Sequence, residues 1–211
     1  MKIVAALTDP ADAARAQEQG ADLIEIRFDL MEGDPPELAE MVTTRCTLPV
    51  IATFRSLQEG GRYAGTPEEW FERVKSVLPF VDFVDVERRF SQCAGAIRQE
   101  GKVVIASYHS DRMPNLYELF DLERTMRQYG DIVKIIVTPQ DRGELIDLIT
   151  FTNAVTGPLC TGVMGDELRS ARAILPVFGS DLAYCRVGQP TSAGQYSIEE
   201  FVRLRDLLGM E

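Results

Sequence analysis

The chain has 211 residues, of which 45% are hydrophobic, so it is long enough for one large domain with a substantial core. Its formal net charge of -11 argues against nucleic acid or an anionic membrane as a partner, because the long-range field repels phosphate. An anionic small molecule can still bind, but only where arginines cluster locally.

Cysteine usage and the N-terminal segment narrow the class of protein further. Cys46, Cys93, Cys160 and Cys185 are far apart, form no CxxC pair and accompany a single histidine, so we expect reduced cysteines and no metal site. The chain reaches Asp9 too soon for a secretory signal peptide, and no apolar run approaches about 18 residues. A cytoplasmic location and no membrane partner are therefore predicted.

Short apolar runs typical of buried strands alternate with amphipathic helical segments along the whole chain. Strands are expected at residues 3–7, 23–29, 50–55, 83–87, 103–109, 132–137, 158–164 and 182–186. Helices are expected at residues 10–19, 35–43, 67–78, 89–100, 115–129, 140–153, 167–175 and 198–208. The last helix begins with a capping box formed by Ser197 and Glu200.

Strict alternation of strands and helices implies a parallel sheet, and eight units of about 25 residues favour a closed barrel. No GxGxxG motif follows the first strand, which weakens the alternative of an open dinucleotide-binding sheet. The sequence contains no linker or low-complexity tract. We therefore predict an α/β fold, a (β/α)8 TIM barrel, as a single compact domain over residues 1–211.

The alternation of side chains along each strand gives a sharper test of the barrel. Alternate residues should face the barrel interior while the others pack against the helices. In nearly every expected strand the polar residues share one face and sit toward the carboxyl end, where barrel enzymes place their chemistry. The converging set is Glu25, Arg27, Arg55, Asp85, Glu87, His109, Lys134 and Arg186.

Lys134 is unusual because it stands in the middle of the apolar run 131–138. Burial of an ammonium costs on the order of several kcal/mol, and a buried lysine usually responds with a lowered pKa. Lys134 is therefore either a strand lysine whose amine reaches solvent or a Schiff-base lysine with a neutral, nucleophilic amine. Nearby arginines would favour the neutral form by like-charge repulsion.

His109, the only histidine, ends its expected strand at a position where a general base can be held. Taken alone, a lone histidine at a strand end is more often structural. Asp85 and Glu87 lie where an acid could orient His109 or raise its pKa.

A series of short motifs occurs in order, each at the end of an expected strand or in the loop beyond it. They are Glu25-Ile-Arg27, Thr53-Phe-Arg55 with Glu59-Gly60-Gly61, Ser107-Tyr-His109, Val133-Lys134, Met164-Gly165 with Arg172, and Thr191-Ser-Ala-Gly-Gln195. Each motif is weak alone, but the ordered set is specific. Over almost its whole length the chain resembles the type I 3-dehydroquinate dehydratases of the shikimate pathway.

This resemblance implies a lyase that dehydrates 3-dehydroquinate, a small anionic substrate, to 3-dehydroshikimate without a cofactor. It implies that Lys134 forms a Schiff base with the ring ketone and that His109 shuttles the protons. It also makes a homodimer plausible. Substrate contacts are implied for Glu25, Arg27, Arg55, Glu59, Arg172, Thr191 and Gln195, with Arg172 on the carboxylate.

The sequence departs from the usual family pattern in two segments. Arg169 competes with Arg172 as the arginine that binds the substrate carboxylate, although the spacing favours Arg172. The last loop reads Thr191-Ser192-Ala193-Gly194-Gln195, where relatives commonly read Ser-Ala-Pro-Gly-Gln. The hydroxyl groups of the loop are retained, but the rigidity that proline gives is not.

Two other functions remain open from the residues alone. A Schiff-base aldolase on the same barrel would bind a sugar phosphate, but Asp166 and Glu167 are unfavourable beside phosphate. A catalytically inactive barrel that serves as a binding module is the alternative from another class. The presence of both Lys134 and His109 argues against it.

Overall fold

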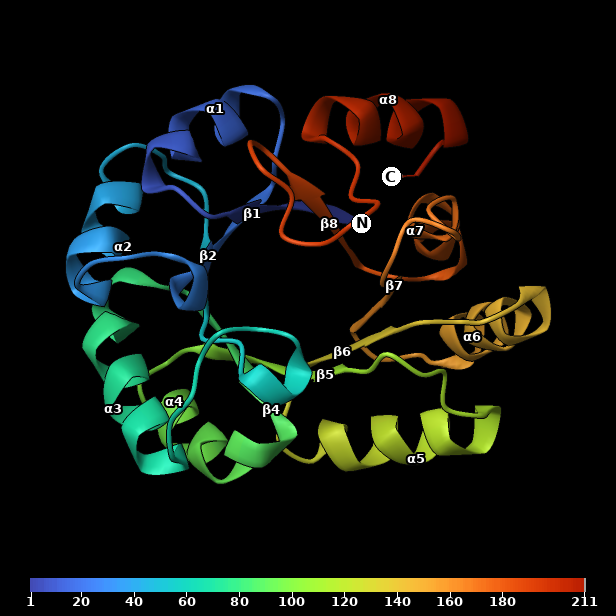
Figure 1. The fold of residues 1–211 in the computed structure, drawn as a ribbon, viewed down its shortest axis with the longest axis horizontal. Helices are drawn as coiled ribbons and strands as arrows, with labels where there is room; N and C mark the ends of the chain where they lie inside the picture. Colours follow the sequence, from blue (N-terminus) through green and yellow to red (C-terminus); the bar gives the residue numbers. More distant parts are fainter. Residues whose placement is uncertain (211) are drawn as a thin grey trace.

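The computed structural model describes residues 1–210, which form a ring of parallel strands surrounded by helices (Figure 1). Each neighbouring pair from β1 to β7 is hydrogen-bonded in chain order, and β8 returns to pair with β1, where Lys2 lies opposite Leu182. The eight strands of this described part are β1 (Lys2–Leu7), β2 (Leu23–Arg27), β3 (Val50–Thr53), β4 (Phe83–Glu87), β5 (Val103–His109), β6 (Ile132–Val137), β7 (Leu159–Val163) and β8 (Leu182–Arg186).

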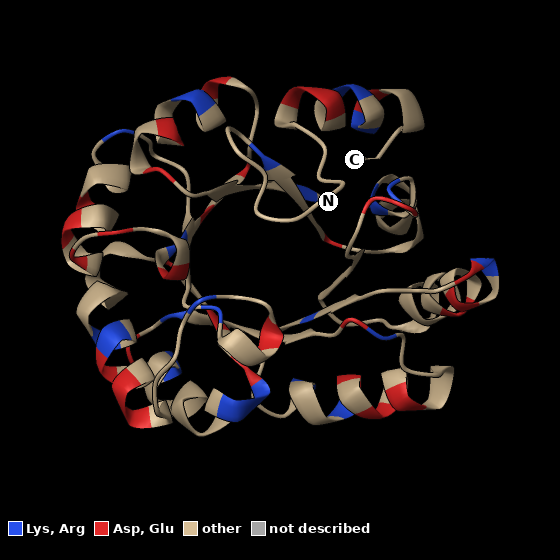
Figure 2. Ribbon diagram, in the orientation of Figure 1, with Lys and Arg blue, Asp and Glu red and all other residues tan. Residues whose placement is uncertain are grey.

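The helices lie outside the ring of strands in Figure 1. Acidic and basic segments are interspersed over them (Figure 2). No helix within residues 1–210 is both long and apolar enough to cross a membrane. The α-helices are α1 (Ala13–Glu18), α2 (Pro35–Thr43), α3 (Pro67–Val77), α4 (Ala94–Gln99), α5 (Leu116–Arg127), α6 (Arg142–Ala154), α7 (Ala171–Ile174) and α8 (Ile198–Leu208).

The predicted (β/α)8 barrel is confirmed, and every expected strand is present, with shifts at some ends. β2 ends at Arg27 rather than at residue 29, because Phe28–Leu30 turns into a 3-10 helix. The helix expected at 167–175 is wrong in length: only Ala171–Ile174 is α-helical, and a 3-10 segment with Pro176 follows it. The predicted domain span of 1–211 includes residue 211, which lies outside the described residues, and it stays a prediction.

The predicted alternation of side chains is also confirmed. The residues expected to face outward, such as Ile24, Val84 and Val133, lie in the two apolar clusters between the strands and the helices. A separate apolar cluster fills the barrel interior. Its buried members are Val4, Leu23, Ile51, Ile105, Cys160 and Leu182. This interior layer closes the barrel below the polar strand ends, so the polar groups have an apolar floor.

An aspartate precedes each even-numbered strand and bonds to the preceding strand at its amino end. In each case the aspartate backbone N–H donates to a carbonyl, and the carboxylate accepts from the N–H of the same residue. The pairs within the described residues are Asp22 with Ile3, Asp82 with Val50, Asp131 with Val104, and Asp181 with Leu159. The repeat ties β1 to β2, β3 to β4, β5 to β6 and β7 to β8.

The pair of Asp181 and Leu159 is the most important of the four for closing the barrel, because no hydrogen-bonded ladder joins β7 to β8 within residues 1–210. Leu159 N–H donates to the Asp181 carboxylate at 2.9 Å, and the Asp181 N–H donates back to the Leu159 carbonyl at 2.7 Å. The Ser180 hydroxyl accepts from Thr161 N–H at 3.0 Å and extends the same connection. One backbone bond and the side chains of Asp181 and Ser180 thus connect β7 to β8, where strand pairing leaves the barrel open.

We predict that Asp181→Ala lowers the free energy of unfolding by about 1–2 kcal/mol, because it leaves the Leu159 N–H without its charged acceptor. Urea unfolding measures the change, and turnover should stay unaltered because Asp181 lies at the end of the barrel opposite the polar strand ends. Asp147→Ala, on the exposed face of α6, is the matched control. Equal stability of the two variants would show that the backbone alone closes the barrel.

Candidate active site

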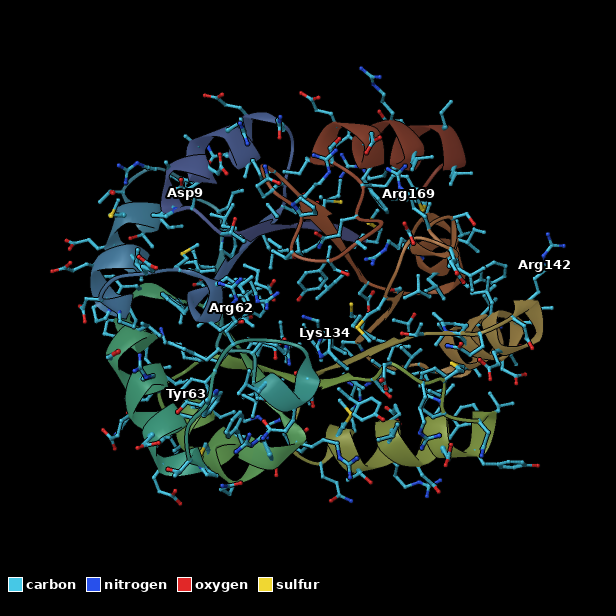
Figure 3. All side chains as sticks on the ribbon, in the orientation of Figure 1. Asp9, Arg62, Tyr63, Lys134, Arg142 and Arg169 are labelled. Atoms are coloured by element: carbon cyan, nitrogen blue, oxygen red, sulfur yellow. The ribbon has the colours of Figure 1, made fainter. Side chains whose placement is uncertain are left out.

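A cavity of about 190 Å3 opens at the carboxyl ends of the strands. Lys134 lies near the middle of the ring of strands in Figure 3. All nine residues predicted for catalysis or substrate binding line this cavity. Its lining comprises Glu25, Arg27, Arg55, Glu59, Gly60, His109, Lys134, Ile136, Met164, Arg172, Tyr184, Thr191, Ser192 and Gln195.

The Lys134 amine is almost completely buried, with 3% of the residue exposed. Its Nζ donates to Asp85 Oδ2 at 3.0 Å and to Glu25 Oε1 at 3.4 Å. The ring centroid of Tyr184 lies 3.9 Å from the same nitrogen. Two carboxylates and one aromatic face therefore surround a single cationic group.

The expectation that nearby arginines keep the Lys134 amine neutral is wrong. Burial alone would lower the pKa of Lys134, but Asp85 and Glu25 raise it above its ordinary value and outweigh the repulsion from Arg55. The two carboxylates contact the amine directly, whereas Arg55 contacts Asp85 and not the amine. Lys134 therefore rests as an ammonium ion.

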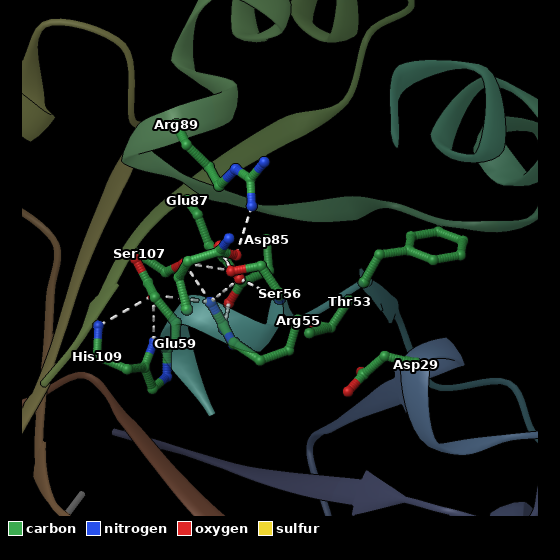
Figure 4. Close-up of polar contacts among 12 residues, drawn as sticks. Asp29, Thr53, Arg55, Ser56, Glu59, Asp85, Glu87, Arg89, Ser107 and His109 are labelled. Carbon is green, nitrogen blue, oxygen red and sulfur yellow. Dashed lines mark hydrogen bonds and ion pairs between the residues drawn. The ribbon is translucent and has the colours of Figure 1, made fainter. Parts of the chain in front are cut away.

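Arg55 contacts three carboxylates of the site, those of Asp85, Glu87 and Glu59 (Figure 4). Its Nη2 is 2.9 Å from Asp85 Oδ2, and its Nη1 is 3.0 Å from Glu87 Oε1 and 3.2 Å from Glu59 Oε2. Burial alone would raise the pKa of Asp85, but Arg55 and Lys134 lower it below its ordinary value. The carboxylate is thus held ionised between two buried cations.

His109 is oriented by Glu59, not by Asp85 or Glu87. Glu59 Oε2 lies 2.9 Å from His109 Nδ1 and also accepts from the His109 backbone N–H at 3.0 Å. Asp85 contacts Lys134 and Arg55 instead, and Glu87 contacts Arg55 and Ser56. The expectation that one of these two acids orients His109 is therefore wrong. Glu59 lies in the loop after β3, and no period or motif in the sequence indicates that this loop folds back over β5.

Glu87 fixes the loop that carries Glu59. Its carboxylate accepts from the backbone N–H of Ser56 at 2.7 Å and from the Ser56 hydroxyl (Figure 4). Arg89 donates to Gly65 O at 3.2 Å farther along the same loop. Because the loop is bonded at both ends, Glu59 has a defined position beside His109.

The protonation states of the two neighbours follow from their surroundings. Burial lowers the pKa of His109 well below its usual range, and the cations Arg55, Lys134 and Arg27 lower it further. Burial also raises the pKa of Glu59 to about 8; Arg55 opposes the shift, while Glu87 and Asp85 add to it. His109 is therefore a neutral imidazole at neutral pH, with a carboxyl group beside Nδ1.

Arg172 is held by the loop that follows β8. Its Nη2 donates to the Ala193 carbonyl at 3.0 Å and to the Ser192 hydroxyl at 3.3 Å. The Arg172 Nε is buried and has no hydrogen-bond partner among residues 1–210. A guanidinium edge with an unpartnered donor suits a planar anion such as a carboxylate.

The loop after β8 is stabilised by the side chain of Gln195. Gln195 Oε1 accepts from Thr191 N–H at 2.8 Å, and Gln195 Nε2 donates to the Thr191 hydroxyl at 2.9 Å. Gly194 has a φ of +74°, and a Cβ there would lie 2.5 Å from the Gly165 carbonyl oxygen. The side chain of Gln195 and the close packing of glycines constrain this loop, which has no proline between Ala193 and Gly194.

Other arginines differ in their relation to the cavity. Arg27 lines it and forms a two-point ion pair with Asp29, with both N–O distances at 3.0 Å. Arg169 does not line it and pairs with Glu200 at 3.0 Å instead, which favours Arg172 for the substrate carboxylate; that assignment stays a prediction. Arg186, which was expected to converge on the same axis, is not among the lining residues.

Sequence reasoning missed the apolar and aromatic part of the lining. Ile136 and Tyr184 have the inward parity of Lys134 and Arg186, and Met164 stands in one of the quoted motifs, but none was given a role. The alternation of inward and outward side chains along β8 could have indicated that Tyr184 faces the barrel interior.

Within residues 1–210, no group of three or more His, Cys, Asp or Glu side chains is arranged to hold a metal ion. The charged groups of the site bond to one another instead. The expectation of a reaction without metal or cofactor stays a prediction.

Comparison with known proteins agrees with this arrangement. The sequence model of the type I 3-dehydroquinase family matches residues 5–211. The 3-dehydroquinate dehydratase of Methanoregula boonei is 58% identical over 208 residues, which cover 99% of this chain and 100% of that protein. The 3-dehydroquinate dehydratase of Methanospirillum hungatei is 36% identical over 208 residues, covering 99% of this chain and 81% of that protein.

A solved structure leads to the same family. The crystal structure of the 3-dehydroquinate dehydratase from Aquifex aeolicus matches with a TM-score of 0.84 and 30% sequence identity, covering 98% of each chain. The relatives cover the chain from end to end, so the family assignment applies to the barrel as a whole. The chain belongs to the type I 3-dehydroquinase family.

Proposed function

We propose that this protein dehydrates 3-dehydroquinate to 3-dehydroshikimate through a Schiff base on Lys134, with His109 as the proton shuttle. The observation that carries the proposal is the placement of both groups on neighbouring strands with their side chains in one cavity. Ser107 lies opposite Lys134 in the ladder, so His109 stands one inward position farther toward the strand end. The names of the relatives supply the substrate.

The first step is the formation of the imine. Lys134 must lose a proton before its nitrogen adds to the substrate ketone, and the carboxylates of Asp85 and Glu25 lie within reach as acceptors. Addition gives a carbinolamine, and loss of water gives the protonated imine. This cation draws electrons away from the adjacent carbon and so lowers the barrier to removal of its proton.

The second step is proton transfer by His109. Glu59 Oε2 already accepts from Arg55 and from the His109 backbone N–H, so it also accepts from Nδ1–H of the neutral imidazole. This tautomer leaves the lone pair of Nε2 available to take the proton from the carbon beside the imine. The resulting enamine expels the ring hydroxyl, to which the imidazolium returns the proton, and water leaves. Hydrolysis of the imine then releases the product and restores the Lys134 amine.

The remaining lining residues suit an anionic, hydroxylated ring. Arg172 offers a buried Nε and is already positioned by the loop after β8, so we assign it to the substrate carboxylate. We assign the substrate hydroxyls to a polar set that lines the same cavity, namely Glu25, Arg27, Arg55, Glu59, Thr191 and Gln195. The family resemblance makes a homodimer and a cytoplasmic location the proposals for assembly and location.

Borohydride trapping tests the imine directly. Incubation with 3-dehydroquinate and borohydride should add the reduced substrate to Lys134, and mass spectrometry of peptides locates the adduct. Lys134→Met should give no adduct and should lower turnover on the order of 10⁴-fold or more, because the nucleophile is lost. Lys75→Met on the exposed face of α3 is the control. Normal turnover by native protein without an adduct would exclude the imine mechanism.

His109→Ala should separate imine formation from the proton transfers. The variant should still form the adduct at Lys134, while turnover falls by about 10²–10⁴-fold because the general acid-base group is lost. The measurement combines steady-state rates with the mass of the trapped protein. Turnover close to that of the native protein would remove the proton shuttle from His109.

The pH dependence of kcat should reflect the surroundings of His109. The base form is the neutral imidazole, so activity is lost as pH falls through its pKa. Because burial, Arg55, Lys134 and Arg27 lower that pKa below 6.5, kcat should hold its plateau down to pH 6.5 and decline only below it. Arg27→Met removes one of the cations and should move the decline toward higher pH. A native profile already half-lost at pH 6.5 would contradict the assignment.

A further inference from the structure

We propose that the aromatic ring of Tyr184 is a catalytic group, whose face stabilises the positive charge on the Lys134 nitrogen in the protonated imine. The proposal rests on the proposed role of Lys134 as the Schiff-base residue. The ring centroid lies 3.9 Å from Nζ, well within the distance of about 6 Å at which a cation and an aromatic face attract. The ring therefore contacts the reacting atom itself.

The position of Tyr184 is fixed by the barrel. It pairs with Val4 in the ladder between β8 and β1, and its side chain packs on the apolar cluster of the barrel interior. From there it faces Lys134 on β6. The ring is thus backed by strands rather than by a loop, and it can hold a constant distance to the lysine nitrogen.

The burial of the Lys134 side chain makes the contact stronger. Lys134 is 3% exposed, and the attraction between a cation and an aromatic face grows when both groups are shielded from water. In a solvated site the same pair would contribute little. The ring belongs to the small number of groups that stabilise charge at Nζ, together with Asp85 and Glu25.

The ring and the carboxylates respond differently when the imine forms. An ammonium has three N–H donors, so it can bond to Asp85 and Glu25 at the same time. A protonated imine keeps the positive charge but has a single N–H, which can serve only one carboxylate in full. The attraction of the ring depends on the charge and not on the number of N–H groups, so it persists through this change.

The ring, rather than the hydroxyl, is the active part of Tyr184. The Tyr184 Oη is buried and has no hydrogen-bond partner among the residues that the structure describes. Burial raises the pKa of Tyr184 although Lys134 opposes the shift, so the side chain is a neutral phenol and not a phenolate. An ion pair between Lys134 and Tyr184 is therefore excluded, and Phe at this position should suffice.

A series of ring substitutions separates charge stabilisation from packing. We compare native protein, Tyr184→Phe, and proteins in which position 184 carries phenylalanine analogues with increasing numbers of ring fluorines. Fluorine weakens the negative face of the ring and nearly preserves its shape, so the fold is retained throughout. Tyr184→Leu removes the ring, and Tyr117→Leu, at an 86% exposed site on α5, is the matched control.

The readouts are kcat and the fraction of protein trapped as the Lys134 adduct under saturating 3-dehydroquinate. Tyr184→Phe should retain both within roughly twofold, because Tyr and Phe offer similar faces to a cation. Successive fluorines should lower both values together, by about tenfold over the series, and Tyr184→Leu should resemble the most fluorinated ring. Tyr117→Leu should match the native protein.

Each contrary result has a separate meaning. Values of kcat and trapped fraction that stay level across the fluorine series would overturn the role of the ring, since a packing role is insensitive to ring charge. Loss of activity in Tyr184→Phe equal to that in Tyr184→Leu would assign the effect to the hydroxyl and would overturn it too. Absence of any adduct in native protein would instead remove the proposed function of Lys134.

Discussion

The ion pair between Lys134 and Asp85 is the interaction on which the rest of the site depends. Neither charge could be buried alone, because an unpaired ion in the barrel interior would lower the free energy of unfolding by on the order of several kcal/mol. Asp85 also contacts Arg55, and Arg55 in turn contacts Glu87 and Glu59. Each buried charged group is thus stabilised by the next one along the network. The polar layer at the strand ends is therefore one connected network, and the apolar layer below it keeps water from its floor.

In this network Lys134 is a cation and His109 is neutral at neutral pH. Contact with Asp85 and Glu25 raises the pKa of Lys134, whereas burial near the cations Arg55 and Lys134 lowers that of His109. A pair of groups whose pKa values are pushed apart can divide the work of one reaction, with one as the electrophile-forming amine and the other as the base. Arg55 lowers the pKa of His109 and opposes the rise in the pKa of Lys134, where the contacts with the carboxylates outweigh it.

The sequence predicted the barrel and the inward face of its strands because both follow from local periodicity. It did not predict the charge state of Lys134, which depends on whether a carboxylate or a guanidinium makes the direct contact. Strand parity brings Asp85 and Arg55 to the same axis but does not rank their distances to Nζ. The alternation of inward and outward residues also does not show how far along a strand the cavity extends. Arg186 was therefore expected to line the cavity, whereas Tyr184, which does line it, was given no role. The partner of His109 lies in a loop, where no period operates, and Glu59 was therefore assigned to the substrate alone.

A resting ammonium is at first sight unsuited to a nucleophile, because the lone pair is blocked until the proton leaves. The cost is incurred once, at the addition step, whereas a positive charge returns to the same nitrogen in the protonated imine. Asp85, Glu25 and Tyr184 are in place before the reaction begins, so they need no reorganisation when that charge reappears. The surroundings of Lys134 are thus complementary to a positive charge on this nitrogen, in the resting ammonium and again in the protonated imine, and not to the free amine.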